Sequence, residues 1–192
     1  QPKSPASWLD SFHSPLLAGV NGASVLKPSY KTNRLSVFEA FITPQESKPL
    51  TATAKLLSPK VVESLPSNFK NINSLSDAEG WYNNMLSESR LFRVNLADTD
   101  TIIGFVFVFV EDDIDAHIGY LLGESYWGQG YATELLEGLI TFMTLENQIN
   151  RLVAGVARNN IVSSKLLHKL GFKISTSEHD ETVFYELLLS HP

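Results

Sequence analysis

The chain has 192 residues, of which 43% are hydrophobic and 19% are charged, so it is long enough for one sizeable domain with its own core. Its formal net charge of −6 argues against a broad surface for nucleic acid or for an anionic membrane, because such surfaces are basic. The absence of cysteine excludes disulfides, thiolate metal sites and a cysteine nucleophile.

No apolar run approaches the roughly 20 residues that a membrane-spanning helix needs. The opening QPKSPASWLD lacks the apolar core of a secretion signal. These features predict a cytoplasmic protein with no membrane or nucleic-acid partner. We also expect no metal centre, and either a monomer or a homodimer.

The first 30 residues are interrupted by four prolines among Ser, Gly and Ala, a composition that disfavours helices and strands alike. We interpret residues 1–30 as a tail or irregular arm and residues 31–192 as one domain. The domain begins with a strand at 34–41, where apolar and polar residues alternate.

Two helices are predicted next, at 52–65 and 77–88. The second has Ser76 as a candidate N-cap and Glu79 three residues later, which together are typical of a capping box. Pro66 and an Asn-rich stretch separate the two helices.

The middle of the chain predicts three strands, at 91–96, 101–111 and 117–122, joined by short polar turns. The second contains GFVFVFV, which is apolar on both faces and therefore predicts a central strand covered on both sides. The remaining elements are a helix at 133–144, a strand at 151–157, a helix at 161–170 ended by Gly171, and strands at 172–177 and 182–189.

Short turns favour antiparallel pairing, whereas the strand–helix–strand unit from 117 to 157 favours one parallel pair. The sequence therefore predicts a single-domain α/β (α+β) fold. Its mixed, mostly antiparallel sheet has six to seven strands, flanked by about four helices.

The stretch SYWGQGYATELL, residues 125–136, places two glycines just before a helical pattern. It does not fit G-x-G-x-x-G, a Walker loop or the G-x-S-x-G nucleophile elbow. A glycine-containing loop that opens a helix can still bind an anion through free backbone N–H groups. Residues 123–135 include Glu124 and Glu134 but no Lys or Arg. An anion site built from backbone alone and an ordinary turn both remain open.

Four segments, in order, carry a family resemblance: NRLSVFEAF, IIGFVFV, IGYLLGESYWGQGYATELL and RNNIVSSKLLHKLGF. The sequence resembles the GNAT N-acetyltransferase superfamily, and most closely its ribosomal-protein N-terminal acetyltransferase (RimJ/RimL-type) branch. The resemblance implies a GNAT fold whose central parallel strands splay apart. It also implies acetyl-CoA as the acyl donor and an amine-bearing acceptor, either a protein N-terminus or a small molecule.

The resemblance assigns the cofactor contacts residue by residue. The main chain of Tyr120, Leu121 and Leu122 would pair with the pantetheine arm. Asn160 would contact the cofactor and Ser163 would lie near the CoA sulfur, with Arg158 and Lys165 as outer partners of the 3′-phosphate. The pyrophosphate loop would comprise Trp127, Gly128, Gln129, Gly130, Tyr131, Ala132 and Thr133. Trp127 replaces the Gln or Arg of the general consensus.

The resemblance also suggests catalytic roles. The Leu122 N–H would stabilise charge on the thioester oxygen, Ser163 would act as the general acid, and Glu124 is the preferred general base, with His117 as an alternative. Ser163 and Asn160 have simpler explanations as helix-start residues. Some relatives carry a Glu on the strand at 151–157, but this chain has Val153 and Gly155 there. A non-catalytic acyl-CoA-binding sensor or interaction module is therefore the alternative to an N-acetyltransferase.

Overall fold

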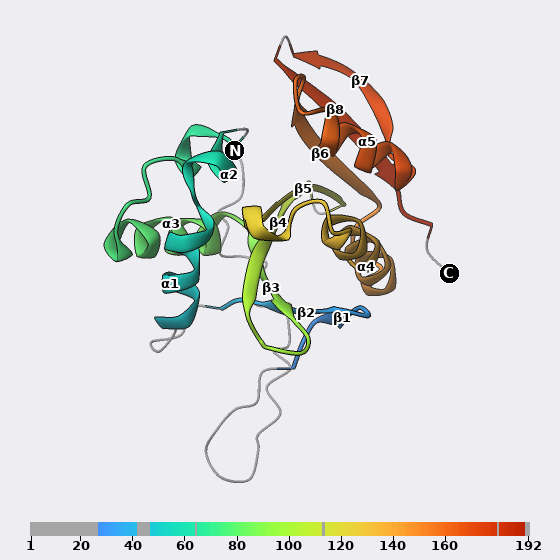
Figure 1. Ribbon diagram of the computed structural model, residues 1–192. Coiled ribbons are helices and arrows are strands. Elements are labelled where there is room, and N and C mark those ends of the chain that lie inside the picture. Colours follow the sequence, from blue (N-terminus) through green and yellow to red (C-terminus); the bar gives the residue numbers. More distant parts are fainter. Residues whose placement is uncertain (1–26, 42–46, 64, 113, 180, 191–192) are drawn as a thin grey trace.

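The computed structural model describes residues 27–41, 47–63, 65–112, 114–179 and 181–190 (Figure 1). The strands are β1 (Tyr30–Lys31), β2 (Leu35–Glu39), β3 (Arg90–Leu96), β4 (Ile102–Glu111), β5 (Asp115–Leu122), β6 (Arg151–Ala157), β7 (Lys173–His179) and β8 (Thr182–Leu188). The helices are α1 (Ser47–Leu56), α2 (Pro59–Val62), α3 (Leu75–Glu88), α4 (Tyr131–Glu146) and α5 (Ile161–Lys169), with 3-10 turns η3 (Ser67–Phe69) and η4 (Glu124–Tyr126).

All the described strands belong to one sheet with the order β1-β2-β3-β4-β5-β6-β8-β7. Only β5 and β6 run parallel, and every other neighbouring pair is antiparallel. The mixed, mostly antiparallel sheet predicted from the turn lengths is confirmed. No helix in the described ranges is both long enough and apolar enough to cross a bilayer.

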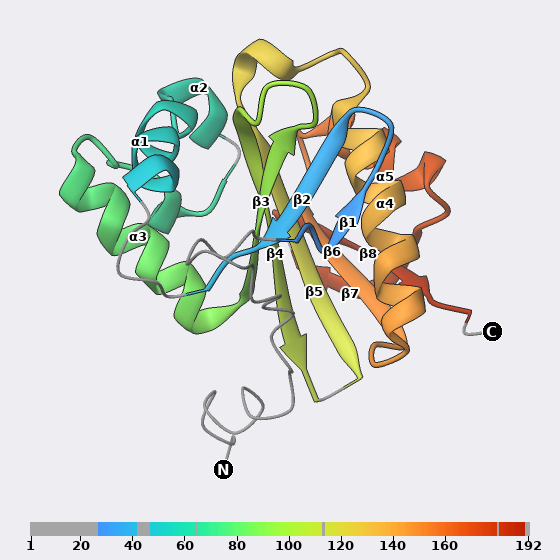
Figure 2. The ribbon, with the colours of Figure 1, turned by 90° about the horizontal axis from the view of Figure 1, so that it is seen from below.

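Strand β4 is buried on both faces, as its unbroken apolar run predicts. Val106 and Val108 belong to a core that includes apolar residues of α4 and α5. Phe105 and Phe107 face the opposite core, formed with α1, α2 and α3. Figures 1 and 2 show the same layering, with α1–α3 on one side of the central strands and α4 on the other.

The parallel pair β5–β6 is joined over only part of its length. Pairing begins at Asp115 with Arg151 and ends at His117 with Val153. Beyond this point β5 remains paired with β4 as far as Leu122, while β6 remains paired with β8 as far as Ala157. The splayed central strands expected from the family resemblance are therefore present.

The element count differs from the prediction in two places. Eight strands are described instead of six to seven, because Tyr30 and Lys31 form the short strand β1 against β2. The predicted helix at 52–65 is two helices, because Ser58 caps α2 and Pro59 occupies its first turn. Proline lacks the N–H that would continue α1, so the helix is interrupted there. Residues 1–26 of the predicted tail lie outside the described residues.

The start of α3 also lies elsewhere than predicted. Ser74, and not Ser76, is the N-cap, and Asp77, not Glu79, completes the capping box. The Ser74 hydroxyl accepts from the Asp77 N–H at 3.0 Å, and the Asp77 carboxylate accepts from the Ser74 N–H at 2.9 Å. Because the cap is Ser74, the helix begins at Leu75, two residues before the predicted start. The shorter carboxylate of Asp serves where the usual motif has Glu or Gln.

Candidate active site

The hydrogen bonds between β5 and β4 show which backbone groups of β5 face the gap between β5 and β6. The Gly123 N–H donates to the Ile103 carbonyl at 2.9 Å, and Leu122 lies opposite Gly104 in the register. In an antiparallel ladder this makes Leu122 a non-hydrogen-bonded position, so its backbone groups point away from β4 and toward the gap. By the same alternation, the backbone groups of Tyr120 face the gap, whereas those of Leu121 face β4.

The Leu122 carbonyl is already bonded, because the indole N–H of Trp127 donates to it at 2.8 Å. The N–H of Leu122 points into the gap. On the opposite side, the Arg158 N–H donates to Glu181 and the register pairs Ala157 with Thr182. The alternation along β6 therefore turns the backbone of Gly155 toward the gap as well. An extended ligand can hydrogen-bond there as an added strand.

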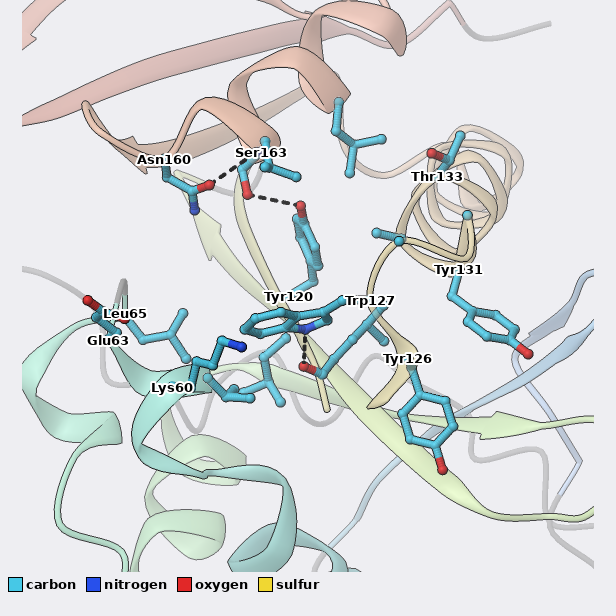
Figure 3. A pocket seen from close by; sticks show the side chains of 18 residues that line it. Lys60, Glu63, Leu65, Tyr120, Tyr126, Trp127, Tyr131, Thr133, Asn160 and Ser163 are labelled. Carbon is cyan, nitrogen blue, oxygen red and sulfur yellow. Dashed lines mark hydrogen bonds between the residues drawn. The ribbon is translucent and has the colours of Figure 1, made fainter. Parts of the chain in front are cut away.

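A cavity of about 610 Å³ occupies this region (Figure 3). It is lined by residues of α2, the end of β5, the following loop and the starts of α4 and α5. The lining residues are Lys60, Val61, Glu63, Leu65, Tyr120, Leu121, Leu122, Tyr126, Trp127, Gly128, Gly130, Tyr131, Ala132, Thr133, Asn160, Val162, Ser163 and Leu166.

Most of the predicted site residues thus line one cavity. Three do not. Gln129 turns its side-chain amide to the Ser125 carbonyl at 2.7 Å, and Lys165 is exposed on α5 outside the lining. Glu124 pairs with Lys60, with a Nζ–Oε1 distance of 2.5 Å, and is also absent from the lining.

The glycine loop enters α4 in a conformation that favours glycine. Gly128 has a φ of 69° and Gly130, the N-cap residue, has a φ of 81°. No described side chain caps the helix, so the N–H groups of Tyr131, Ala132 and Thr133 have no helical partner. The Glu134 N–H makes the first helical bond, to the Gly130 carbonyl at 3.1 Å. Free amides and the helix dipole both favour an anion at this point.

Two hydroxyl groups meet across the gap. The Tyr120 side chain extends from β5 and its hydroxyl lies 3.2 Å from Ser163 Oγ, on the first turn of α5 (Figure 3). Burial raises the pKa of Tyr120, an effect that the hydrogen bond with Ser163 partly offsets. The phenol therefore keeps its proton at neutral pH. Asn160 is the N-cap of α5, and its Oδ1 accepts from the Ser163 N–H at 3.2 Å.

Sequence reasoning missed the contribution of α2. Lys60 and Glu63 line the cavity, and Lys60 Nζ lies 5.7 Å from the centre of the Trp127 ring. The prediction of one continuous helix gave no sign that this segment would bend toward the gap. The Ser58-Pro59 pair was the available signal, because it marks a helix start. The sequence predicted only a main-chain contact of Tyr120 with the cofactor. It did not indicate that the Tyr120 hydroxyl would hydrogen-bond with Ser163.

The curated proteins that this sequence resembles are named as N-acetyltransferases. The sequence of p20 from Bacillus licheniformis, an uncharacterised N-acetyltransferase, is 34% identical over 88 residues, which are 45% of this chain and 49% of that protein. The chain spans about half the length of the curated relatives it matches.

Two solved structures share the fold. RimL, a ribosomal alpha-N-protein acetyltransferase in complex with coenzyme A, has a TM-score of 0.67 at 18% identity, covering 86% of this chain and 98% of that one. The spermidine N-acetyltransferase of Vibrio cholerae, in complex with CoA and spermine, has a TM-score of 0.65 at 16% identity, covering 81% and 96%. Residues 40–173, more than half of the chain, match the acetyltransferase (GNAT) domain, and the chain belongs to this family.

Proposed function

We propose that the chain is an acetyl-CoA-dependent N-acetyltransferase that transfers an acetyl group directly to a primary amine in a ternary complex. The observation that carries this proposal is the gap between β5 and β6, where the Leu122 N–H faces the cavity. The uncapped start of α4 lies at the same cavity. Together these features fit a ligand such as acetyl-CoA, in which a pantetheine arm joins a thioester to a diphosphate.

The loop residues would bind the pyrophosphate mainly with backbone. Gly128 has open space around its Cα, and a side-chain atom at Gly130 would meet only the Arg34 guanidinium. A phosphate can therefore approach the amides of 131–133 closely, with each charged hydrogen bond contributing roughly 1.5–3 kcal/mol. The pantetheine arm would pair with the gap-facing backbone of Tyr120 and Leu122, and Asn160 would contact its outer part.

In the reaction, the neutral amine nitrogen attacks the thioester carbonyl carbon and a C–N bond forms. Negative charge develops on the carbonyl oxygen, where the Leu122 N–H donates a hydrogen bond. The C–S bond then breaks, and the thiolate takes a proton from the hydroxyl pair of Ser163 and Tyr120, which lie 3.2 Å apart. The proton lost by the amine passes to water or to a general base.

The general base expected from the sequence does not line the cavity. Glu124 is the candidate from the sequence, but its carboxylate is occupied by Lys60 and lies outside the cavity lining. An acceptor with an α-amine, whose pKa is near 8, is about one tenth neutral at pH 7 and needs little help from a base. We therefore favour a protein N-terminus or another amine of low pKa over an ordinary lysine side chain.

A non-catalytic acyl-CoA-binding module is the second candidate function. The observation in its favour is the side of the gap formed by β6, where Val153 and Gly155 provide no carboxylate. Such a module would bind the thioester as proposed above but would not transfer its acyl group to an amine.

Thermal unfolding with acetyl-CoA, followed by CoA release with a panel of peptide α-amines and polyamines, separates these functions. At 100 times its Kd, acetyl-CoA should stabilise the protein by about 2.7 kcal/mol, and at least one amine should release CoA. Stabilisation without turnover on any amine would favour the module. No stabilisation would contradict both functions.

A further inference from the structure

Glu134 places a negative charge close in sequence to the amides that would bind the anion. Glu134 is on the first turn of α4, one residue after the three unpaired amides, and its side chain is 18% exposed. A carboxylate at this position opposes a bound diphosphate. The loop itself, residues 127–133, contains no Lys or Arg to offset it.

The turn between β1 and β2 supplies the missing positive charge. Arg34 Nε donates to Glu134 Oε2 at 2.7 Å. The other carboxylate oxygen accepts from the Arg34 backbone N–H at 2.7 Å and from the Thr32 hydroxyl at 2.6 Å. The Glu134 carboxylate is therefore held by three donors and is turned toward the β1–β2 turn.

The same guanidinium also holds the loop. Arg34 Nη1 donates to the Gln129 carbonyl at 3.0 Å, and the guanidinium carbon lies 4.2 Å from the centre of the Tyr131 ring. Gln129 and Tyr131 are on either side of Gly130, the residue with left-handed backbone. The Arg34 side chain thus contacts the loop immediately before and after Gly130, although Arg34 and Gln129 are 95 residues apart in the sequence.

We propose that Arg34 is a positioning residue for the diphosphate of the acyl donor, acting by neutralising Glu134 and by fixing the backbone of residues 129–131. Its Nε and Nη1 donors are directed to Glu134 and Gln129, so these two act through the carboxylate and the loop backbone, while Nη2 lies 3.5 Å from the position of a Cβ at Gly130. Lysine cannot reproduce the arrangement, because one ammonium cannot span both acceptors while stacking on Tyr131. This inference rests on the proposed function.

The test measures equilibrium binding of CoA and of pantetheine, which lacks the diphosphate. Arg34→Met should weaken CoA binding about tenfold, the loss of roughly one charge-assisted hydrogen bond, and should change pantetheine binding less than twofold. Arg34→Lys should fall between Arg34→Met and the wild type. Equal weakening for CoA and pantetheine would mean a general structural defect and would overturn the proposal.

A second variant separates neutralisation from direct contact. Glu134→Gln in the Arg34→Met background removes the uncompensated carboxylate and should recover CoA affinity to within about threefold of wild type. No recovery would overturn the proposal that Arg34 acts by neutralising Glu134. If the wild type itself fails to bind CoA, the proposed function fails first, whereas wild-type binding that Arg34→Met leaves unchanged contradicts this inference alone.

Arg151→Met is the matched control. Arg151 also pairs with a carboxylate, that of Asp115, and the exposed fractions of the two arginines are 40% and 39%. Neither arginine lines the cavity, but the Arg151 guanidinium donates to Asp115 and Glu186, whereas that of Arg34 donates to the loop at the Gln129 carbonyl. Arg151→Met should therefore lose a similar surface ion pair without changing CoA affinity, and a tenfold loss in this variant would contradict the assignment to Arg34.

Discussion

The region that would bind the acyl donor, residues 115–172, and the helical cover of residues 47–88 are built by different means. The first depends on backbone: a splayed strand pair, a loop before α4 with two glycines of positive φ, and a helix start without a cap. The second depends on side-chain packing, in which Trp81 meets Phe69, Phe105 and Phe107 edge to face. A site made of backbone has a recognisable spacing in the sequence, whereas a packed cover is satisfied by many apolar combinations.

The largest expected effect tests whether the aromatic cluster around Trp81 contributes stability alone. Trp81 is 5% exposed and lies outside the cavity lining, so Trp81→Ala should lower the free energy of unfolding by about 3–5 kcal/mol. The CoA affinity of the folded fraction should not change. Denaturant unfolding and CoA titration measure the two quantities.

Trp81→Phe is the control for that experiment. Phenylalanine keeps an aromatic ring in the cluster and removes an indole N–H for which the structure gives no hydrogen-bond partner. We expect a loss of stability well below that of Trp81→Ala. A large loss of CoA affinity in either folded variant would erase the distinction between the two regions.

The next effect concerns Gly130, the residue that precedes α4. Gly130→Glu should weaken CoA binding by about a hundredfold, near 2.7 kcal/mol, because it places a carboxylate beside the amides of α4. Gly130→Ala measures the part of this loss that arises from the φ of 81°. Titration calorimetry of both variants gives the electrostatic share by difference.

Gly80→Glu serves as the matched control, since Gly80 is exposed on α3 and a Cβ there meets nothing within 4 Å. It should leave CoA affinity unchanged. If Gly130→Glu binds CoA as tightly as Gly130→Ala does, no anion binds at this loop.

A smaller effect is expected for the hydroxyl pair. Ser163→Ala and Tyr120→Phe should each lower kcat about tenfold or more while changing the KM for acetyl-CoA little, because they remove a proton donor for the leaving thiolate. Steady-state kinetics with the best amine of the panel provide the measurement. An unchanged kcat in Ser163→Ala would remove Ser163 as the acid, and the same result in Tyr120→Phe would remove the phenol.

The smallest effect is a pH dependence of stability. Burial raises the pKa of Glu134, but hydrogen bonds from Thr32 and Arg34 outweigh it and hold the pKa below its ordinary value of 4.5. A lowered pKa in the folded state contributes stability above pH 4.5 that is lost as the pH falls through the folded-state pKa. The stability difference between wild type and Glu134→Gln should therefore shrink below pH 4.5.

Unfolding free energies at several pH values between 7 and 3 provide this measurement. Glu137→Gln is a suitable control, because Glu137 is exposed on the same helix. A difference between wild type and Glu134→Gln that stays constant over the whole range would contradict the ion pair at the start of α4.

The sequence predicted the sheet well wherever local pattern determines structure. The run GFVFVFV predicted β4, and Gly171 was correctly placed just after α5, with a φ of 90°. Prediction was weaker where one element ends and another begins. Ser74 and Ser76 each have an acidic residue three positions later, and the structure uses the pair Ser74 and Asp77.

Contacts distant in sequence could not be predicted from spacing. The absence of basic residues at 123–135 suggested a cradle with no nearby positive side chain, yet Arg34 reaches it from the β1–β2 turn. No periodicity connects positions 34 and 134, because the contact exists only once β1 and β2 pack beside α4. The pairing of Lys60 with Glu124 was missed for the same reason.

Amide hydrogen exchange at Leu122 tests the central claim most directly. The account predicts that the Leu122 N–H, which faces the gap, becomes protected when acetyl-CoA saturates the protein. The Leu121 N–H, which faces β4, should be protected with or without acetyl-CoA and is the internal control. Exchange at Leu122 that is unchanged by saturating acetyl-CoA would contradict the account.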